Sequence, residues 1–406
     1  MRTRFRNGID RRQFLAGSAI TAGVLAAPGV LRAAPSSIKI GLIHPVTGAL
    51  AYSGTQCRAG GELAISDINA AGGIKSLGGA KLEAILGDSL SKPDVGASET
   101  AKAIEAGACG IVAGYASAIT LATSQEAAKT NTPHVVDVGV TDTIVTRGLK
   151  NTFRFSPGYG KIASDAVTAL AQINKDAGSP AKTVVIVHED SAFGAGTAKL
   201  LSEKLPEHGF KILAVISHPT PMRDFTNIAL QIKSVQPDIV IPANYYNEYV
   251  LLARTIRQQQ VKAKAIYSVL GGAASSFKFV KDFPQAAEGV MDCNHWYNPK
   301  SDLALARKAA VEAKGLFYTY EVYLTYNAVA LLADAIERAG STDKEKVIAA
   351  LNSSTWDKHG MPYGLTRFVN GQNEGAQPVN TQVQNGKIDV IRPAEFASAK
   401  PIFPLT

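Results

Sequence analysis

The chain has few of the residues that form disulfides or bind metals. Its 406 residues include 3 Cys, 4 Met and 7 His. An odd number of cysteines cannot all pair within one chain, and the spacing of these three fits no zinc-binding pattern. We therefore expect Cys57, Cys109 and Cys293 to be small buried side chains, and we predict no metal site.

The sequence also lacks the motifs of most cofactor and catalytic chemistry: no His-Glu-x-x-His, no phosphate-binding P-loop and no Gly-x-Ser-x-Gly. Residues 194–199 follow a predicted strand, as a dinucleotide-binding loop would, but Lys199 stands where the third glycine belongs. We interpret this segment as a tight turn. The nearby run 188–190, His-Glu-Asp, would suit a metal or a general base, but polar loops after strands are common. We predict no cofactor and no enzymatic activity.

Excess charge of one sign is absent from most of the chain. The formal net charge is +8, but residues 1–34 contain six arginines and one aspartate. The remaining residues hold 36 basic and 33 acidic side chains, a net charge of +3. The body of the protein is therefore nearly neutral, and we do not expect it to bind nucleic acid.

The basic segment at the N-terminus is typical of an export signal. Residues 1–13 are basic and polar, residues 14–31 are uncharged, and small residues follow at 33–34. Residues 11–15, Arg-Arg-Gln-Phe-Leu, resemble the twin-arginine motif of bacterial export signals. We predict a cleaved twin-arginine-type signal over residues 1–34; a retained membrane anchor is the alternative.

Beyond this segment, predicted strands and helices alternate in two successive rounds. The first has strands at 38–43, 81–86, 110–114 and 134–138, and the second at 183–188, 212–216, 238–243 and 265–268. A helical pattern follows most of these strands, and residues 318–339 form a longer helical stretch. Such alternation predicts two α/β lobes with parallel sheets. Residues 381–391, centred on Asn385-Gly386, predict a hairpin.

The candidate ligand-binding residues lie where strands end and helices begin, because open α/β sheets bind ligands there. Ser117 follows one strand, where it would bind an anion or simply cap its own helix. The next strand ends in Val138, Gly139, Val140 and Thr141. Tyr245 follows a strand of the second lobe and would form a wall of a small-molecule pocket or lie on the surface.

Several segments together resemble the leucine/isoleucine/valine-binding family of type I periplasmic solute-binding proteins, which supply ABC importers. Asp-Ile-Asn-Ala-Ala-Gly-Gly-Ile at 67–74 is the most specific of them. Others are Tyr-Ser-Gly at 52–54, Val-His-Glu-Asp at 187–190, Phe-Gly at 193–194 and Tyr-Asn-Ala at 326–328. The resemblance implies two doubly wound lobes that are joined by a three-stranded hinge and close on a ligand.

The resemblance also implies roles for single residues. Ser117 matches the serine that binds the ligand carboxylate, and Phe193 and Tyr245 match aromatic walls. Ser53, or Tyr52 after a one-residue shift, matches a residue lining the cleft.

Three departures from the family pattern concern the ligand. Val140 replaces a hydroxyl residue, which Thr141 restores only if the register shifts. Val269 stands where an acid pairs with the ligand ammonium, and Glu321 is a candidate substitute. The family disulfide is missing.

The resemblance predicts lobe I at 38–155 and 290–362, lobe II at 156–289 and 363–390, and a C-terminal tail at 391–406. We expect a periplasmic monomer that captures a branched-chain amino acid, or another small carboxylate or amide, and delivers it to an ABC permease. The alternatives are a ligand-sensing receptor domain of the same fold and a periplasmic enzyme that uses Ser117 with a histidine.

Overall fold

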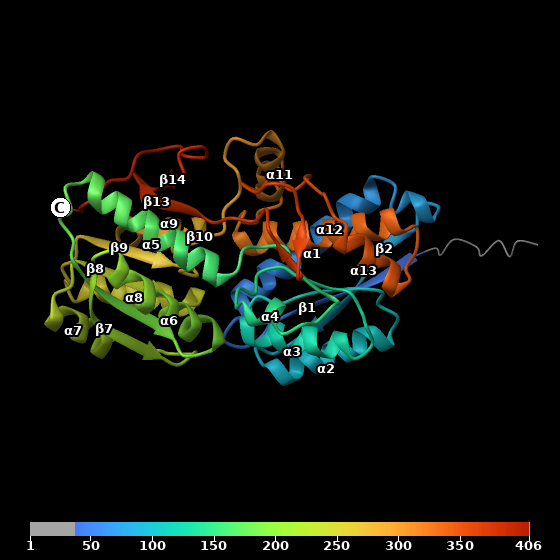
Figure 1. Ribbon diagram of the computed structural model, residues 1–406, viewed down its shortest axis with the longest axis horizontal. Coiled ribbons are helices and arrows are strands. Elements are labelled where there is room, and N and C mark those ends of the chain that lie inside the picture. The colour runs from blue at the N-terminus through green and yellow to red at the C-terminus, as the bar shows by residue number, and fades with distance from the viewer. Residues whose placement is uncertain (1–36, 406) are drawn as a thin grey trace, which may run out of the picture. The chain divides into compact units, whose positions relative to one another are not determined.

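The computed structural model describes residues 37–405, so the predicted export signal at 1–34 lies outside the described residues. The described part contains two seven-stranded sheets (Figure 1). The strand order is β11-β12-β5-β4-β3-β1-β2 in the first sheet and β14-β13-β10-β9-β8-β6-β7 in the second. The predicted fold class, two doubly wound α/β lobes, is confirmed.

The first lobe is built on a sheet whose central strands are parallel and buried, and only β11 runs antiparallel to its neighbour. Its strands are β1 (Ser37–His44), β2 (Lys81–Asp88), β3 (Ile111–Ala113), β4 (His134–Val136), β5 (Thr152–Arg154), β11 (Phe368–Val369) and β12 (Gln372–Asn373). Its helices are α1 (Ala51–Ala70), α2 (Pro93–Glu105), α3 (Ser117–Ala128), α4 (Thr143–Thr146), α12 (Tyr320–Ala339) and α13 (Lys344–Asn352), with a 3-10 turn η1 (Lys75–Leu77).

The second lobe repeats this plan with an antiparallel hairpin at one edge. Its strands are β6 (Thr183–Glu189), β7 (Lys211–His218), β8 (Ile239–Ala243), β9 (Ala265–Val269), β10 (Met291–Asn294), β13 (Val379–Gln384) and β14 (Lys387–Arg392). Its helices are α5 (Tyr159–Asp176), α6 (Ala192–Glu207), α7 (Thr226–Val235), α8 (Tyr246–Gln258), α9 (Phe277–Asp282) and α10 (Pro284–Ala287). One further helix, α11 (Asp302–Glu312), follows β10.

Helices cover both faces of the first sheet. Figure 1 shows α1, α12 and α13 on one side of β1, and α2 and α3 on the other. Gly60 permits the close packing of α1 on α12, because a Cβ at this position would lie 2.2 Å from the backbone oxygen of Val322. The long helix predicted at 318–339 is therefore part of the first lobe, although it lies far along the chain from α1.

The chain passes between the two sheets three times, after β5, after β10 and after β12. Two lobe boundaries differ from those expected. Strand β10 belongs to the second sheet, whereas the sequence predicts residues 290–362 in lobe I. Strands β11 and β12 belong to the first sheet, whereas the sequence predicts residues 363–390 in lobe II. Short strands at a hinge carry no composition signal that tells which sheet they join.

The hairpin predicted near the C-terminus is confirmed as β13 and β14. Its two turn residues, Asn385 and Gly386, have φ angles of 52° and 72°. An Asn-Gly pair is common in such turns because both residues adopt positive φ at low cost. Strand β14 extends to Arg392, so the tail expected at 391–406 begins two residues later.

Cys57, Cys109 and Cys293 are buried and unpaired, as predicted. None of the helices in the described part of the chain has the length and apolar character needed to cross a membrane.

Candidate functional site

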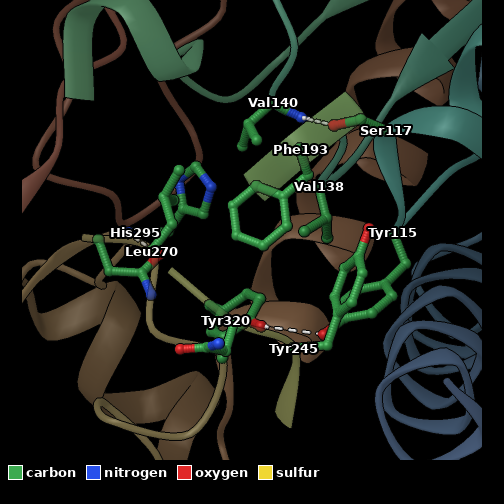
Figure 2. A pocket seen from close by; sticks show the side chains of 12 residues that line it. Tyr115, Ser117, Val138, Val140, Phe193, Tyr245, Leu270, His295 and Tyr320 are labelled. Atoms are coloured by element: carbon green, nitrogen blue, oxygen red, sulfur yellow. Dashed lines mark hydrogen bonds between the residues drawn. The ribbon is translucent and has the colours of Figure 1, made fainter. Parts of the chain in front are cut away.

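A pocket lies where strands of the two sheets end. Its empty space, including space open to solvent, is about 340 Å³. Its lining comes from the ends of β3, β4, β8, β9 and β10 and from the starts of α3, α6 and α12 (Figure 2). The twelve residues are Tyr115, Ser117, Val138, Val140, Phe193, Asn244, Tyr245, Leu270, Gly272, Asn294, His295 and Tyr320.

Ser117 is the first residue of α3, and its hydroxyl does not cap this helix. Its Oγ instead accepts hydrogen bonds from the backbone N–H groups of Val140, at 3.3 Å, and Thr141, at 3.2 Å. The interpretation of Ser117 as a helix cap is therefore wrong. With both bonds accepted, the hydroxyl proton is available to donate to an acceptor in the pocket.

The buried side chain of Arg154, which is 2 % exposed, supports the turn after β4. Its Nη1 donates to the backbone oxygens of Val140, at 2.7 Å, and Thr141, at 2.8 Å, and its Nη2 bonds Asp142 at 2.9 Å. These bonds orient the carbonyls of the turn toward the guanidinium. The turn that supplies N–H groups to Ser117 is thus held rigidly.

A buried hydrogen-bonded pair, Asp137 and His44, supports the turn after β3. Asp137 bonds the Nε2 atom of His44 at 2.8 Å and accepts from the backbone N–H groups of Val138, at 2.7 Å, and Tyr115, at 3.4 Å. The pKa of Asp137 is lowered by these bonds, which outweigh the opposing effect of burial. Tyr115 has a φ of 65°, so this network stabilises an uncommon backbone conformation beside the pocket.

The same pair forms, with Cys57, a buried group whose possible ligand atoms lie within 4.8 Å of one another. The oxygens of Asp137 already accept from His44, from two backbone N–H groups and from Thr325 at 2.8 Å. Burial raises the pKa of the Cys57 thiol well above its usual value, which disfavours the thiolate that metals require. Hydrogen bonds within the protein therefore explain why these three side chains lie close together.

Aromatic side chains from both lobes form the pocket walls. The ring of Tyr245 lies 5.7 Å from that of Tyr115 and 5.2 Å from that of Phe193. Tyr320, at the start of α12, places its hydroxyl 3.5 Å from that of Tyr115. Figure 2 shows His295 on the other side of the pocket from Tyr115 and Tyr245.

Tyr52 and Ser53 line a smaller neighbouring space of about 150 Å³, together with Tyr115 and Tyr245. The ring of Tyr52 lies 4.1 Å from that of Tyr246, and Asn247 donates to the backbone oxygen of Ala49 at 3.1 Å. These contacts connect the two lobes at the rim. Tyr52 and Ser53 are therefore beside the main pocket, not in its lining.

Glu321 is buried and is not among the lining residues. Burial raises its pKa from 4.5 to about 7. A carboxyl group in this position is a poor partner for a ligand ammonium, and none of the twelve lining residues is acidic. The neighbouring Tyr320 lines the pocket instead.

Five of the ten candidate residues from the sequence meet in the main pocket: Ser117, Val138, Val140, Phe193 and Tyr245. Gly139 packs against α3, because a Cβ there would lie 2.3 Å from the Oγ1 atom of Thr120. Thr141 is buried and bonds Thr143 at 3.2 Å, so no register shift brings its hydroxyl into the lining.

Sequence reasoning missed seven lining residues. Tyr115 stands in the strand-end segment that contains Ser117, and Asn244 directly precedes Tyr245, so the strand-end rule could have found both. The other five depend on where the hinge and the second lobe place them: Leu270, Gly272, Asn294, His295 and Tyr320.

The segment with a dinucleotide-loop pattern is a helix start. Gly194 lies inside α6, where a Cβ would be 2.2 Å from the backbone oxygen of Glu189, and a Cβ at Gly196 would be 2.8 Å from the ring of Tyr159. Both glycines therefore serve packing. In the nearby His-Glu-Asp run at 188–190, the Nδ1 atom of His188 bonds the backbone oxygen of Glu189 at 2.7 Å, so this nitrogen has a partner within the loop.

Comparisons with known proteins show which family has this architecture. A family model described as "Periplasmic binding protein" matches residues 37–387. The Leu/Ile/Val-binding protein homolog 8 of Brucella abortus (strain 2308) is 26% identical over 394 residues, which cover 94% of this chain and 96% of that protein.

Two solved structures share the fold. The branched-chain amino acid transporter substrate-binding protein LivJ of Streptococcus pneumoniae, in complex with isoleucine, has a TM-score of 0.72 at 24% identity and covers 88% of this chain and 100% of its own. A solute-binding protein of an ABC transporter from R. palustris, in complex with benzoate, has a TM-score of 0.76 at 18% identity, with 90% and 99% covered. At these identities the likeness concerns the fold. The family model, which spans most of the described chain, shows that this chain belongs to the periplasmic binding protein family.

Proposed function

We propose that this protein is the periplasmic receptor of an ABC importer and that it captures a small carboxylic acid with an apolar body and no ammonium group. The observation that carries the proposal is the composition of the pocket: a hydroxyl at a helix N-terminus, aromatic walls and no acidic side chain. The transport role is supported by the S. pneumoniae protein of the same fold, which is a branched-chain amino acid transporter substrate-binding protein.

The carboxylate is assigned to Ser117. Its hydroxyl proton is available, and α3 begins at this lining residue, so the positive end of the helix dipole lies beside the pocket. A hydrogen bond to a charged group contributes about 1.5–3 kcal/mol, which is tenfold or more in affinity.

The absence of an ammonium follows from charge balance. A ligand ammonium that entered this pocket would leave water without meeting a carboxylate among the twelve lining residues. Burial raises the pKa of nearby Glu321 to about 7, so much of this side chain is uncharged at neutral pH. The R. palustris relative that was solved with benzoate supports an acid without an amine on this fold.

Binding by lobe closure completes the proposal. The ligand contacts both lobes, so it stabilises the arrangement in which they meet, and a membrane permease then recognises that arrangement. In this role the protein releases its ligand unchanged and acts as a monomer. The predicted export signal would bring it to the periplasm.

A thermal-shift and calorimetry panel tests this function. We expect benzoate, phenylacetate and isovalerate to raise the melting temperature, and leucine, isoleucine and phenylalanine to raise it much less. Mass spectrometry should recover the bound acid unchanged. Tight leucine or isoleucine binding without binding of any amine-free acid would contradict the proposed ligand class and favour a branched-chain amino acid receptor.

A further inference from the structure

The pocket contains polar atoms that the carboxylate site does not use. Both ring nitrogens of His295 and the Oδ1 atom of Asn244 have no hydrogen-bond partner within the described chain. His295 is 1 % exposed and Asn244 is fully buried, and both line the pocket. Buried polar groups are nearly always paired, so these atoms require partners from outside the described chain, and a ligand in the pocket would supply them.

The position of His295 is fixed by its backbone. Its N–H donates to the Oδ1 atom of Asn294 at 2.7 Å, and its carbonyl accepts from the hydroxyl of Tyr323 at 3.0 Å. Its ring packs 6.0 Å from the ring of Tyr320. The imidazole is therefore held beside the pocket without any bond to its own nitrogens among the described residues.

His295 is neutral. Burial, with a smaller contribution from the charge of Arg154, lowers its pKa to about 3. A neutral imidazole has one nitrogen that donates and one that accepts. It therefore offers a ligand one donor and one acceptor and no charge.

The orientation of Asn244 follows from its neighbour. The Nδ1 atom of His218 lies 2.9 Å from the backbone oxygen of Pro219 and must donate to it. Burial lowers the pKa of His218, so the ring is neutral and its Nε2 atom accepts. That atom is bonded to the Nδ2 atom of Asn244, which leaves the Oδ1 atom as an acceptor.

We propose that Asn244 and His295 together bind a hydroxyl group of the ligand, so that the natural ligand is a hydroxylated small carboxylic acid. The inference rests on the carboxylate-binding function proposed above and narrows its substrate class. A hydroxyl is the group that suits both residues, because it carries one proton to donate to the Oδ1 atom of Asn244 and lone pairs to accept from the N–H of His295. A carbonyl would leave Asn244 unpaired, and an ammonium would find no countercharge.

Calorimetry with benzoate and with 2-, 3- and 4-hydroxybenzoate tests the inference. We expect at least one hydroxybenzoate to bind about tenfold tighter than benzoate, because one added buried hydrogen bond is worth about that factor. In His295→Phe and Asn244→Leu the ratio of hydroxybenzoate to benzoate affinity should fall to about one, whatever these changes in the lining do to the affinity for benzoate itself. His208→Phe, on an exposed histidine next to α6, should leave the ratio unchanged.

The outcomes separate this inference from the proposed function. Benzoate binding with no gain from any hydroxyl, or a gain that persists in His295→Phe, would overturn the hydroxyl site and leave the carboxylate receptor standing. Failure of all four acids, with leucine or isoleucine bound instead, would overturn both. Circular dichroism and the melting temperature report that each variant has folded.

Discussion

The ring of Tyr115, from the first lobe, lies 5.7 Å from the ring of Tyr245, from the second, at an interplanar angle of 43°. The two residues follow β3 and β8, whose carboxyl ends face each other across the pocket. Aromatic pairs at this separation stabilise each other by about 0.5–1.5 kcal/mol beyond the area they bury. The pair therefore favours the arrangement in which the lobes meet.

Replacing Tyr245 tests this wall. Tyr245→Ala should weaken binding of a carboxylate ligand by about tenfold or more, because it removes a ring that contacts both Tyr115 and Phe193. Tyr245→Phe keeps the ring and loses only a long contact of 3.5 Å to Ser191, so its affinity should stay within about threefold. Calorimetry measures the affinity of both variants for the carboxylate ligand. Equal losses of affinity in the two variants would show that the hydroxyl of Tyr245, and not its ring, contributes to binding.

Ser117→Ala should weaken binding of a carboxylate by about tenfold or more, because a charge-assisted hydrogen bond is lost. The melting temperature should fall only modestly, since the backbone N–H groups of Val140 and Thr141 lose one shared acceptor. Lys199→Ala, on the exposed face of α6, is the control and should bind normally. Unchanged affinity in Ser117→Ala would remove this residue from the site, and loss of binding in the control would reopen the nucleotide-loop interpretation.

Glu321 should make stability depend on pH. Its pKa is raised from 4.5 to about 7 by burial, so between these values the folded chain holds a proton that the unfolded chain has released. The contribution of Glu321 to the free energy of unfolding is therefore most favourable below about pH 4.5. It declines as the pH rises to about 7 and does not change further at higher pH.

At high pH the folded chain holds the Glu321 carboxylate charged and buried, which costs stability. Glu321→Gln removes this cost. The free energy of unfolding should exceed that of the unmodified chain by on the order of 3 kcal/mol at pH 8, with the difference shrinking toward pH 5. Denaturant titrations at several pH values measure it, and Glu207→Gln, at an exposed position at the end of α6, is the control. A difference independent of pH would contradict the raised pKa.

Gly60→Ala should destabilise the first lobe by about 1–3 kcal/mol, because the added Cβ meets the backbone of α12 and neither helix can move freely. Gly364→Ala is the matched control, since its Cβ would lie 3.8 Å from the nearest atom of Gly375, an ordinary contact. Thermal unfolding compares the two variants. Equal stability of Gly60→Ala and the unmodified chain would show that α1 and α12 tolerate a wider separation.

The sequence alone determined the two α/β lobes, since alternating strands and helices bury their apolar faces in only a few ways. It also located Ser117 and Tyr245, because parallel strands bring their carboxyl ends to one edge of a sheet whatever the surrounding detail. The hairpin at Asn385-Gly386 followed from local turn chemistry.

Tertiary structure alone decided the rest of the site. Whether Glu321 or its neighbour Tyr320 lines the pocket depends on the rotation of α12 about its axis, which packing against α1 sets. His295 enters the pocket only because the hinge after β10 turns toward the first lobe. Contacts between segments far apart in the chain determine the positions of Tyr320 and His295. Such contacts cannot be predicted from local sequence patterns.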